Sequence, residues 1–406
     1  MFMATMTYTT RTTCRLCSGD KLRSVLHLGG LFVSDFVPKN FEGGIRAPLE
    51  LVVCENQACG LLQLRDTAPQ EIMYARHYWY RSGLNQVIID DLRDIAEKSQ
   101  KMAALKDGDV ILDIGANDGV LLGFFPKNYV RVGCEPADNL EDELKKHADH
   151  VIHDFWSEEL YRKLGLPPAK IVTAIGMFYD MEDPNQFVRD AAKVMADDGI
   201  FIAQLMTLKP MIEKNDLGNV CHEHLEYYSY PALTYLFEKN GLEIFQVEEN
   251  SINGGSYRLY ARKLKNGSIK YPEPVFDYER FAKNIEDNKK TTVDFIKDAV
   301  ARGKRVYGFG ASTKGNTILQ YFGLGPELVT AISDKSEEKW GKYTIGTMIP
   351  IVSEEEAHAM KPDYFLILPW AFTDTFVKLE ADWLKGGGKF IVPFPEFRVI
   401  GREALA

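Results

Sequence analysis

Short apolar stretches recur through the middle of the chain, and longer amphipathic stretches separate them. In a region that ends near residue 262, the apolar stretches are DVILDIG, RVGCEP, KIVTAIGMF, GIFIAQL, EIFQVEE and YRLYARK. Strands that alternate with helical stretches favour a mainly parallel sheet covered by helices on both faces. The pattern therefore predicts an α/β fold for this part of the chain.

Two helical patterns and a second strand–loop–helix pattern flank this region. Apolar positions at mixed three- and four-residue spacing predict a helix over residues 69–104, and a charged stretch predicts another over 278–302. After it, KRVYGFGASTKGN repeats the order strand, glycine loop, helix, and AISD, DYFLILP and KFIVPFP continue it as strands. We expect a small N-terminal domain over 1–70, a central Rossmann-like domain over 71–272 and a second Rossmann-like domain over 273–406.

Length, charge and hydropathy narrow the class of protein. At 406 residues the chain can form two or three domains with their own cores, and its formal net charge is −10. This acidic balance, without a long run of Lys and Arg, argues against nucleic acid as a partner. No apolar run is long enough to span a membrane, and the first thirteen residues lack the apolar core of a secretory signal. We expect a cytoplasmic protein with no membrane partner, and the sequence is compatible with a monomer.

Four of the six cysteines form two close pairs in the N-terminal region. Two residues separate Cys14 from Cys17, and four separate Cys54 from Cys59. Two such pairs can close a tetrahedral thiolate site, the usual form of a structural zinc. A domain of about 70 residues also gains from a metal because its own core is small. We predict a structural zinc with four thiolate ligands and no open position for catalysis; four reduced cysteines without metal are the alternative.

A glycine loop follows the first strand of the central domain, in VILDIGANDGVLL. Gly115 and Gly119 let the backbone approach a ligand closely, at the end of a strand where doubly wound sheets bind nucleotides. The acids Asp113 and Asp118 disfavour a pyrophosphate there but suit the positive sulfonium of S-adenosylmethionine. Glu135 ends the next strand, where a carboxylate can accept hydrogen bonds from ribose hydroxyls. The residues predicted to bind this cofactor are Asp113, Gly115, Asn117, Asp118, Glu135 and Asp154.

The segment CHEHLEYYS concentrates ionisable side chains. His222 and His224 share a face if the segment is extended, with Glu223 between them. It is not the HExxH motif of metalloproteases, because Glu226 stands where the second histidine is needed. A histidine can accept a proton at neutral pH, and a nearby carboxylate or tyrosine can orient it. The segment is a candidate for general-base catalysis, with a polar surface turn as the alternative.

The loop GFGASTKGN opens the last domain. Its glycines, its lysine and the backbone amides at a helix N-terminus can cradle a diphosphate, and its order is not that of an ATP-hydrolysing loop. Asp334 ends the next strand and can take a ribose, whereas Arg258 in NGGSYR can pair with a phosphate or lie on the surface. The residues predicted to bind such a ligand are Gly310, Ser312, Thr313, Lys314, Asn316, Asp334 and Arg258. A glycine turn without ligand is the alternative.

Taken in order, CRLC with CENQAC, DIGANDGVLL, HEHLEYYS, NGGSYR and GFGASTKGN resemble the deoxysugar C-methyltransferases. The resemblance covers nearly the whole chain, from Cys14 to about Arg398, and the motifs discriminate better together than singly. It implies a zinc-binding N-terminal domain, a domain for S-adenosylmethionine and a C-terminal Rossmann-like domain that binds a nucleotide sugar.

The resemblance also implies a reaction. A 4-keto-deoxysugar linked to dTDP or GDP loses a proton from the carbon next to its ketone, and the resulting enolate takes the methyl group. His224 resembles the family's base, with Glu223 ordering the site, and a base of this kind is worth about 10²–10⁴-fold. The enolate oxygen also needs a donor, such as a phenol or a cation. The candidate catalytic residues are His222, Glu223, His224, Tyr78 and Tyr80.

Two positions depart from the family. Cys221 stands where a tyrosine often precedes HEH, and Asn253 stands where a histidine usually precedes GGS. If these groups contact the substrate, the sugar or the carbon that is methylated can differ from the family's, because a thiol is a poorer hydrogen-bond donor than a phenol. The sequence does not say which nucleotide, ring carbon or stereochemistry applies. Methylation at oxygen or nitrogen, a NAD-dependent oxidoreductase with structural zinc, and a non-catalytic nucleotide-sugar-binding protein are the alternatives.

Overall fold

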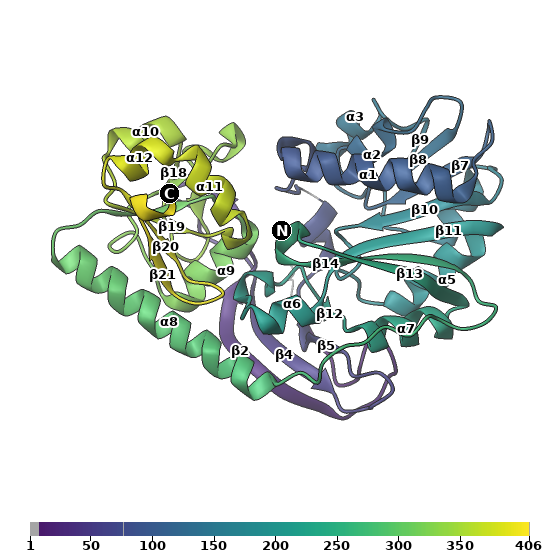
Figure 1. Cartoon of the computed structure of the whole chain (residues 1–406), viewed down its shortest axis with the longest axis horizontal. Helices are drawn as coiled ribbons and strands as arrows, with labels where there is room; N and C mark the ends of the chain where they lie inside the picture. Colours follow the sequence, from purple (N-terminus) through teal and green to yellow (C-terminus); the bar gives the residue numbers. More distant parts are fainter. Residues whose placement is uncertain (1–7, 76, 406) are drawn as a thin grey trace, which may run out of the picture.

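The computed structural model describes residues 8–75 and 77–405. Two larger lobes, one central and one C-terminal in sequence, stand beside each other, and the N-terminal strands lie below and between them (Figure 1). Strands of the N-terminal region pair with strands from both of the larger lobes. The three parts of the chain therefore form one connected body.

A seven-stranded, mainly parallel sheet forms the core of the central domain. In spatial order its strands are β13 (Leu242–Asn250), β14 (Ser256–Lys263), β11 (Met195–Met206), β10 (Ala169–Ile175), β7 (Val110–Ile114), β8 (Val130–Cys134) and β9 (His150–Ile152). Only β14 runs antiparallel to both of its neighbours. The helices are α1 (Gln86–Ala103), α2 (Val120–Gly123), α3 (Glu141–Leu144), α4 (Glu158–Lys163), α5 (Pro184–Val194), α6 (Leu208–Glu213) and α7 (Tyr230–Lys239). Since α1 covers one face and α5 and α7 the other, the predicted layers are confirmed (Figure 1).

The C-terminal domain repeats this architecture on a smaller scale. In spatial order its strands are β18 (Ile351–Val352), β16 (Ile332–Ser333), β15 (Val306–Phe309), β19 (Tyr364–Ile367), β20 (Lys389–Val392) and the antiparallel β21 (Arg398–Ile400). Its helices are α8 (Tyr278–Ala301), α9 (Thr313–Phe322), α10 (Glu354–Ala359), α11 (Thr373–Leu379) and α12 (Ala381–Lys385). The charged helix and the second α/β unit are confirmed. The strand order reverses between β15 and β19, which is where open α/β sheets bind their ligands.

The N-terminal domain completes its sheets with strands from the other two domains. Its strands are β1 (Thr9–Thr10), β2 (Leu22–Phe32), β3 (Phe36–Val37), β4 (Arg46–Cys54), β5 (Leu62–Leu64) and β6 (Asp66–Thr67). The antiparallel sheet of β2, β4 and β5 gains a fourth strand, β12 (Glu226–Tyr227), from the chain that follows HEH. On the other side, β3 pairs with β17 (Tyr343–Thr344) of the C-terminal domain.

The helix predicted over residues 69–104 is wrong in its first half. The structure has a single wide turn at Glu71–Ala75, chain without helix or strand over 77–81 and a short turn at Ser82–Leu84 before α1 begins. The amide and the carbonyl of Tyr78 bond to the side chain of Asn139 at 2.9 and 3.0 Å. A backbone amide and carbonyl that are hydrogen-bonded to a side chain of another element are not available for the hydrogen bonds of a helix. The amphipathic spacing corresponds to a helix only over Gln86–Ala103, where the apolar face of α1 packs on the sheet.

Residues 264–277 connect the central sheet to α8 without a helix or strand, and the boundary predicted at residue 272 lies within this connector. The boundaries at residues 70 and 272 stay predictions. No helix among the described residues is both long enough and apolar enough to cross a membrane.

Candidate active site

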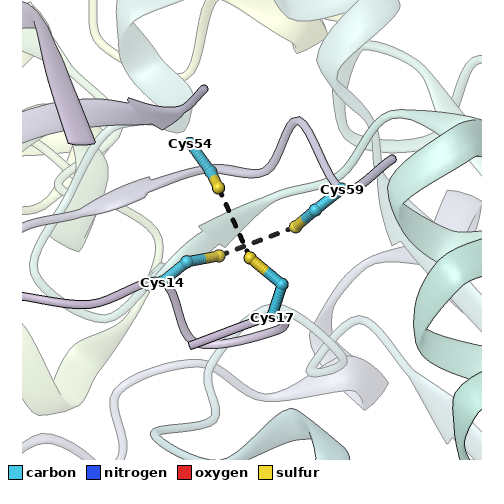
Figure 2. A group of neighbouring side chains, drawn as sticks. All are labelled: Cys14, Cys17, Cys54 and Cys59. Atoms are coloured by element: carbon cyan, nitrogen blue, oxygen red, sulfur yellow. Dashed lines mark hydrogen bonds between the residues drawn. The ribbon is translucent and has the colours of Figure 1, made fainter. Parts of the chain in front are cut away.

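The four N-terminal cysteines converge as the spacing predicts. Their sulfur atoms all lie within 4.8 Å of one another, with 3.6 Å between Cys14 and Cys59 and 3.5 Å between Cys17 and Cys54 (Figure 2). These separations are too long for disulfides, in which the sulfurs are about 2.05 Å apart. They fit a tetrahedral zinc, whose Zn–S bonds of about 2.3 Å place the sulfurs ~3.8 Å apart. The donor set fits zinc, and four thiolates leave no position for a substrate.

One cavity of about 570 Å³ joins the central and C-terminal domains. Its walls come from the carboxyl ends of the central strands, from the HEH segment and from the loops that follow β15 and β19. It therefore reaches the switch point of the C-terminal sheet. The cavity brings together the predicted residues Tyr78, Tyr80, Asp113, Gly115, Asn117, Glu135, Asp154, Glu223, His224, Ser312, Thr313 and Lys314.

The glycine loop after β7 forms one end of the cavity. Gly115 has a φ of +73°, and a Cβ at this position would lie 2.6 Å from Cγ of Met177, so both the backbone conformation and the space require glycine. Asp113 is buried and accepts a hydrogen bond from the Thr173 hydroxyl at 2.6 Å. Burial raises the pKa of Asp113 to about 7. A carboxyl so poorly solvated is suited to a cationic ligand, because a nearby positive charge favours its ionised form.

Glu135, at the end of β8, shapes the same loop. Its two carboxylate oxygens accept from the backbone amides of Asn117 at 2.9 Å and Ala137 at 3.0 Å. Each oxygen can accept a further bond, so a ribose at this place remains compatible with the contacts. Burial raises the pKa of Glu135. The residue fits the predicted cofactor site both by position and by chemistry.

Asn117 and Asp118 hold the chain that enters α1. The side chain of Asn117 accepts from the amide of Ser82 at 3.0 Å and donates to the carbonyl of Tyr80 at 3.1 Å. A carboxylate oxygen of Asp118 accepts from the amide of Gly83 at 2.8 Å, and Asp118 is not among the residues that line the cavity. Both residues therefore position the segment of Tyr80 over the glycine loop.

The HEH segment separates its two histidines. His224 lines the cavity, and its Nδ1 lies 2.8 Å from the carbonyl oxygen of Asn219. His222 is buried away from the cavity, with Nε2 3.1 Å from the carbonyl oxygen of Ala47. A catalytic contact by His222 is therefore not supported: the side chain faces the N-terminal sheet, because the backbone turns at this point and the two histidines do not share one face.

Three buried acids line the same cavity as His224. Glu223, Asp180 and Asp216 line the cavity and are 6%, 9% and 7% exposed. Burial is the main cause that raises the pKa of each of these carboxyls, whereas the charge of Lys314 acts in the opposite direction. Burial first, and then Lys314, lowers the pKa of His224 well below its ordinary value. The imidazole is thus neutral at pH 7 and able to accept a proton.

Only some of the predicted ligand-binding residues in the loop after β15 line the cavity. Ser312, Thr313 and Lys314 line the cavity, whereas Gly310 and Asn316 do not. The amide nitrogen of Asn316 donates to the carbonyl of Asp35 at 3.3 Å, and a Cβ at Gly310 would lie 2.7 Å from Pro369. These two residues shape the loop.

Asp334 already has partners on its own domain. Its carboxylate accepts from the amide of Ser336 at 2.8 Å and lies 3.6 Å from the ammonium of Lys339. The same ammonium donates to the carbonyl of Ala311 in the glycine loop at 2.7 Å. Lys339 therefore bridges the two elements between which a dinucleotide's ribose would lie, which disfavours NAD binding in the usual manner.

Arg258 is not placed to pair with a phosphate. Its guanidinium donates to Asp94 at 2.6 Å, Asp91 at 2.8 Å and Gln204 at 2.8 Å, and it is 3% exposed. The sequence suggested an available cation at the entry of a strand. The fold instead brings α1 against β14, so that two acids of α1 and Gln204 of β11 engage the guanidinium.

The structure adds residues that the motifs did not single out. Asp180 follows β10 and Trp370 follows β19, so a search for polar or aromatic residues at the ends of predicted strands could have found both. Trp370 donates from Nε1 to Asp216 at 2.6 Å and so joins the C-terminal domain to the central one. Asn219, which holds His224, carries no signal of its own in the sequence. Of the two family departures, Asn253 lines the cavity and Cys221 is buried behind it.

Three protein-family comparisons match the chain in succession. A zinc binding domain matches residues 14–74, a methyltransferase domain matches 80–247, and a C-methyltransferase C-terminal domain matches 251–395. The C-methyltransferase NovU of Streptomyces niveus is 30% identical over 415 residues, which cover 96% of this chain and 97% of that protein. The order of domains agrees with the order of sites described above.

Two solved methyltransferase-fold structures resemble the chain over less than half of its length. Mitomycin 7-O-methyltransferase MmcR is 16% identical with a TM-score of 0.35, covering 45% of this chain and 55% of its own. Mycolic acid cyclopropane synthase CmaA1, complexed with SAH and CTAB, is 12% identical with a TM-score of 0.35. The match covers 47% of this chain and 90% of that protein. These values carry no functional argument, and the family rests on the full-length relative and the domain matches. The chain belongs to the C-methyltransferase family and is an S-adenosylmethionine-dependent C-methyltransferase with an N-terminal zinc-binding domain.

Proposed function

We propose that the chain methylates a ring carbon next to the ketone of a 4-keto-deoxysugar linked to dTDP or GDP, with His224 as the base. One observation carries the proposal. His224 is held by Asn219 in the wall of a cavity that reaches both the Gly115 loop and the switch point of the C-terminal sheet. A base, a methyl donor site and a nucleotide site can therefore serve one substrate.

The hydrogen bond of His224 sets which ring nitrogen is basic. A carbonyl oxygen only accepts, so the Nδ1 that faces the Asn219 carbonyl carries the hydrogen. Nε2 of the neutral ring then holds the free electron pair. Because its pKa is lowered, the ring is unprotonated at neutral pH and is ready to take a proton from carbon.

Two subsites follow from the fold. S-adenosylmethionine supplies the electrophilic methyl group, and Asp113, Gly115, Asn117, Glu135 and Asp154 would hold it. The sugar nucleotide would lie at the switch point between β15 and β19, with Ser312 and Thr313 at the N-terminus of α9 near its diphosphate. Tyr78 stays protonated, since burial and the Asp180 carboxylate raise its pKa, and its hydroxyl can donate to the sugar. We also propose a cytoplasmic location, in which the four thiolates stay reduced.

The alternatives are weaker on this geometry. The family places the methyl group on carbon, and deprotonation of carbon requires the neutral base that His224 provides. A NAD-dependent oxidoreductase would need Asp334, whose carboxylate is engaged by Ser336 and Lys339. A binding protein without catalysis gives no reason for a buried, oriented histidine beside the methyl donor site.

The experiment follows proton exchange and methyl transfer separately. The protein is incubated in deuterated water with dTDP-4-keto-6-deoxyglucose or GDP-4-keto-6-deoxymannose, with and without S-adenosylmethionine, and products are read by mass spectrometry and NMR. We expect wild type to exchange the proton next to the ketone and to methylate that carbon. His224→Ala should lose both while still binding S-adenosylmethionine, and His27→Ala, at an exposed position of β2, should keep both. Exchange that survives in His224→Ala would remove His224 as the base, and a methyl group found on oxygen or nitrogen would overturn C-methylation.

A further inference from the structure

Lys314 belongs to the C-terminal domain but reaches the central one. It lies in the first turn of α9, and its ammonium contacts the sulfur of Met206, the last residue of β11, at 3.2 Å. The side chain thus crosses the boundary between the domains and ends beside the methyltransferase sheet. This contact places the ammonium away from the glycine loop of its own domain and next to the end of β11.

The ammonium is a cation without a carboxylate partner. Over residues 8–75 and 77–405, no Asp or Glu oxygen forms an ion pair with it within 4.0 Å. Lys314 is nevertheless close enough to lower the pKa values of Glu223, Asp180 and His224 by its charge. A thioether is a weak acceptor, so donor capacity remains for a ligand in the cavity.

The reaction needs a cation or strong donor at one further place. When carbon loses its proton to His224, negative charge develops on the ketone oxygen, and a donor aimed at that oxygen is commonly worth 10²–10³-fold (about 2.7–4 kcal/mol). Among the described residues that line the cavity, Lys314 is the only Lys or Arg. The other donors there, such as the hydroxyl of Tyr78, are neutral.

We propose that Lys314 is a catalytic residue whose ammonium donates a hydrogen bond to the ketone oxygen and stabilises the enolate. The inference rests on the proposed function. The C–H bond next to the ketone breaks and its proton goes to Nε2 of His224, while the electron pair moves to the oxygen that Lys314 contacts. The C–CH₃ bond then forms as the S–CH₃ bond of S-adenosylmethionine breaks, the ketone reforms, and S-adenosylhomocysteine and the His224 proton are released.

The decisive comparison separates this role from binding of the diphosphate. Lys314→Met should lower kcat and the rate of proton exchange by about 10²–10³-fold, while dTDP and GDP bind within twofold of wild type by calorimetry. Lys314→Arg keeps the charge and should recover part of the loss. Lys378→Met, at an exposed position of α11, should match wild type in every assay. If Lys314→Met binds dTDP or GDP tenfold more weakly at unchanged kcat, Lys314 is a diphosphate ligand and the inference fails.

A readout without turnover tests the placement itself. Histidine resonances followed by NMR should show that Lys314→Met raises the pKa of His224, because a nearby positive charge is removed. An unchanged pKa would overturn the placement. Wild type that methylates neither keto sugar overturns the proposed function, and this role with it. Wild type that methylates, with Lys314→Met equally fast, overturns only the role of Lys314.

Discussion

The guanidinium of Arg15 lies 3.6 Å from the carboxylate of Glu226, and both side chains are fully buried. Arg15 belongs to the turn between the zinc ligands Cys14 and Cys17, and Glu226 begins β12, two residues after His224. One buried charge pair therefore joins the zinc site to the segment of the proposed base. A zinc held by four thiolates would have no open position for chemistry, but it would fix the turn that supports this segment.

Removal of Arg15 should be costly for stability. Arg15→Met leaves the carboxyl of Glu226 buried without its cation, and breaking such a pair lowers the free energy of unfolding by about 3–5 kcal/mol. The substitution also removes the guanidinium's bonds to Leu64, Thr67 and Glu182, which adds to the loss. Arg23→Met is the matched control, because its pair with Glu55 at 3.8 Å is about half exposed and should be worth less than about 1 kcal/mol. Urea unfolding of the two variants gives the comparison. Equal losses would show that the buried guanidinium of Arg15 stabilises the fold no more than the half-exposed one of Arg23.

Zinc content should follow the N-terminal cysteines alone. We expect one zinc per chain by elemental analysis, loss of the metal in Cys59→Ser, and retention in Cys134→Ser, whose sulfur lies at the end of β8. Cobalt in place of zinc should give the absorption of a tetrahedral thiolate site and leave methyl transfer unchanged, because four protein ligands leave no open position. A change of kcat on cobalt substitution at equal stability would assign the metal a catalytic role.

His222 should make stability depend on pH below neutrality. Burial lowers its pKa to about 4, so the unfolded chain binds a proton below about pH 6.5 whereas the folded chain does not. Stability is therefore lost as the pH falls from about 6.5 toward 4. His222→Gln keeps a donor for the Ala47 carbonyl and should lose about 2 kcal/mol less than wild type between pH 7.5 and 4.5. Urea unfolding at both pH values checks this, with the exposed His27→Gln expected to behave as wild type.

Trp370 should hold the two large domains in register. Trp370→Phe removes the donor to the buried Asp216, which should lower the free energy of unfolding by about 1–3 kcal/mol and weaken the binding of dTDP or GDP. Trp340→Phe also removes an indole donor, to the carbonyl of Asp334 at 2.8 Å, but at a residue that is 41% exposed. Calorimetry and urea unfolding compare the pair. Indistinguishable variants would contradict a special role for Trp370.

Local patterns predicted the sites whose residues lie close together in sequence. The cysteine pairs, the glycine loop after β7 and the loop after β15 each place chemistry at the end of a strand or in a tight turn, and the fold keeps them there. The doubly wound layers follow from the alternation of strand and helix alone. These features depend on short-range periodicity, which the sequence carries directly.

The errors concern partners that are distant in sequence. Arg258 is paired with Asp94, 164 residues away, and the N-terminal half of the predicted helix is unwound by Asn139, 61 residues from Tyr78. His222 is the third case: its ring contacts the backbone carbonyl of Ala47 in the N-terminal sheet, 175 residues away, and so points away from the cavity. Whether a side chain or backbone group bonds to a local or a distant partner is decided by tertiary packing, and no local sequence pattern contains that information. Which motif residues line the cavity and which only support it therefore depends on contacts between distant parts of the chain.

The sheets of the N-terminal domain include strands from the other two domains, and this has a consequence for synthesis on the ribosome. This domain leaves the exit tunnel before the other two domains, yet β5 has an open edge until Glu226–Tyr227 is made, and β3 lacks its partner strand until Tyr343–Thr344 is made. An open strand edge can pair with another chain, so the nascent polypeptide carries this exposure through most of its elongation. The N-terminal domain can thus complete its sheets only after the whole central domain and part of the C-terminal domain have been made.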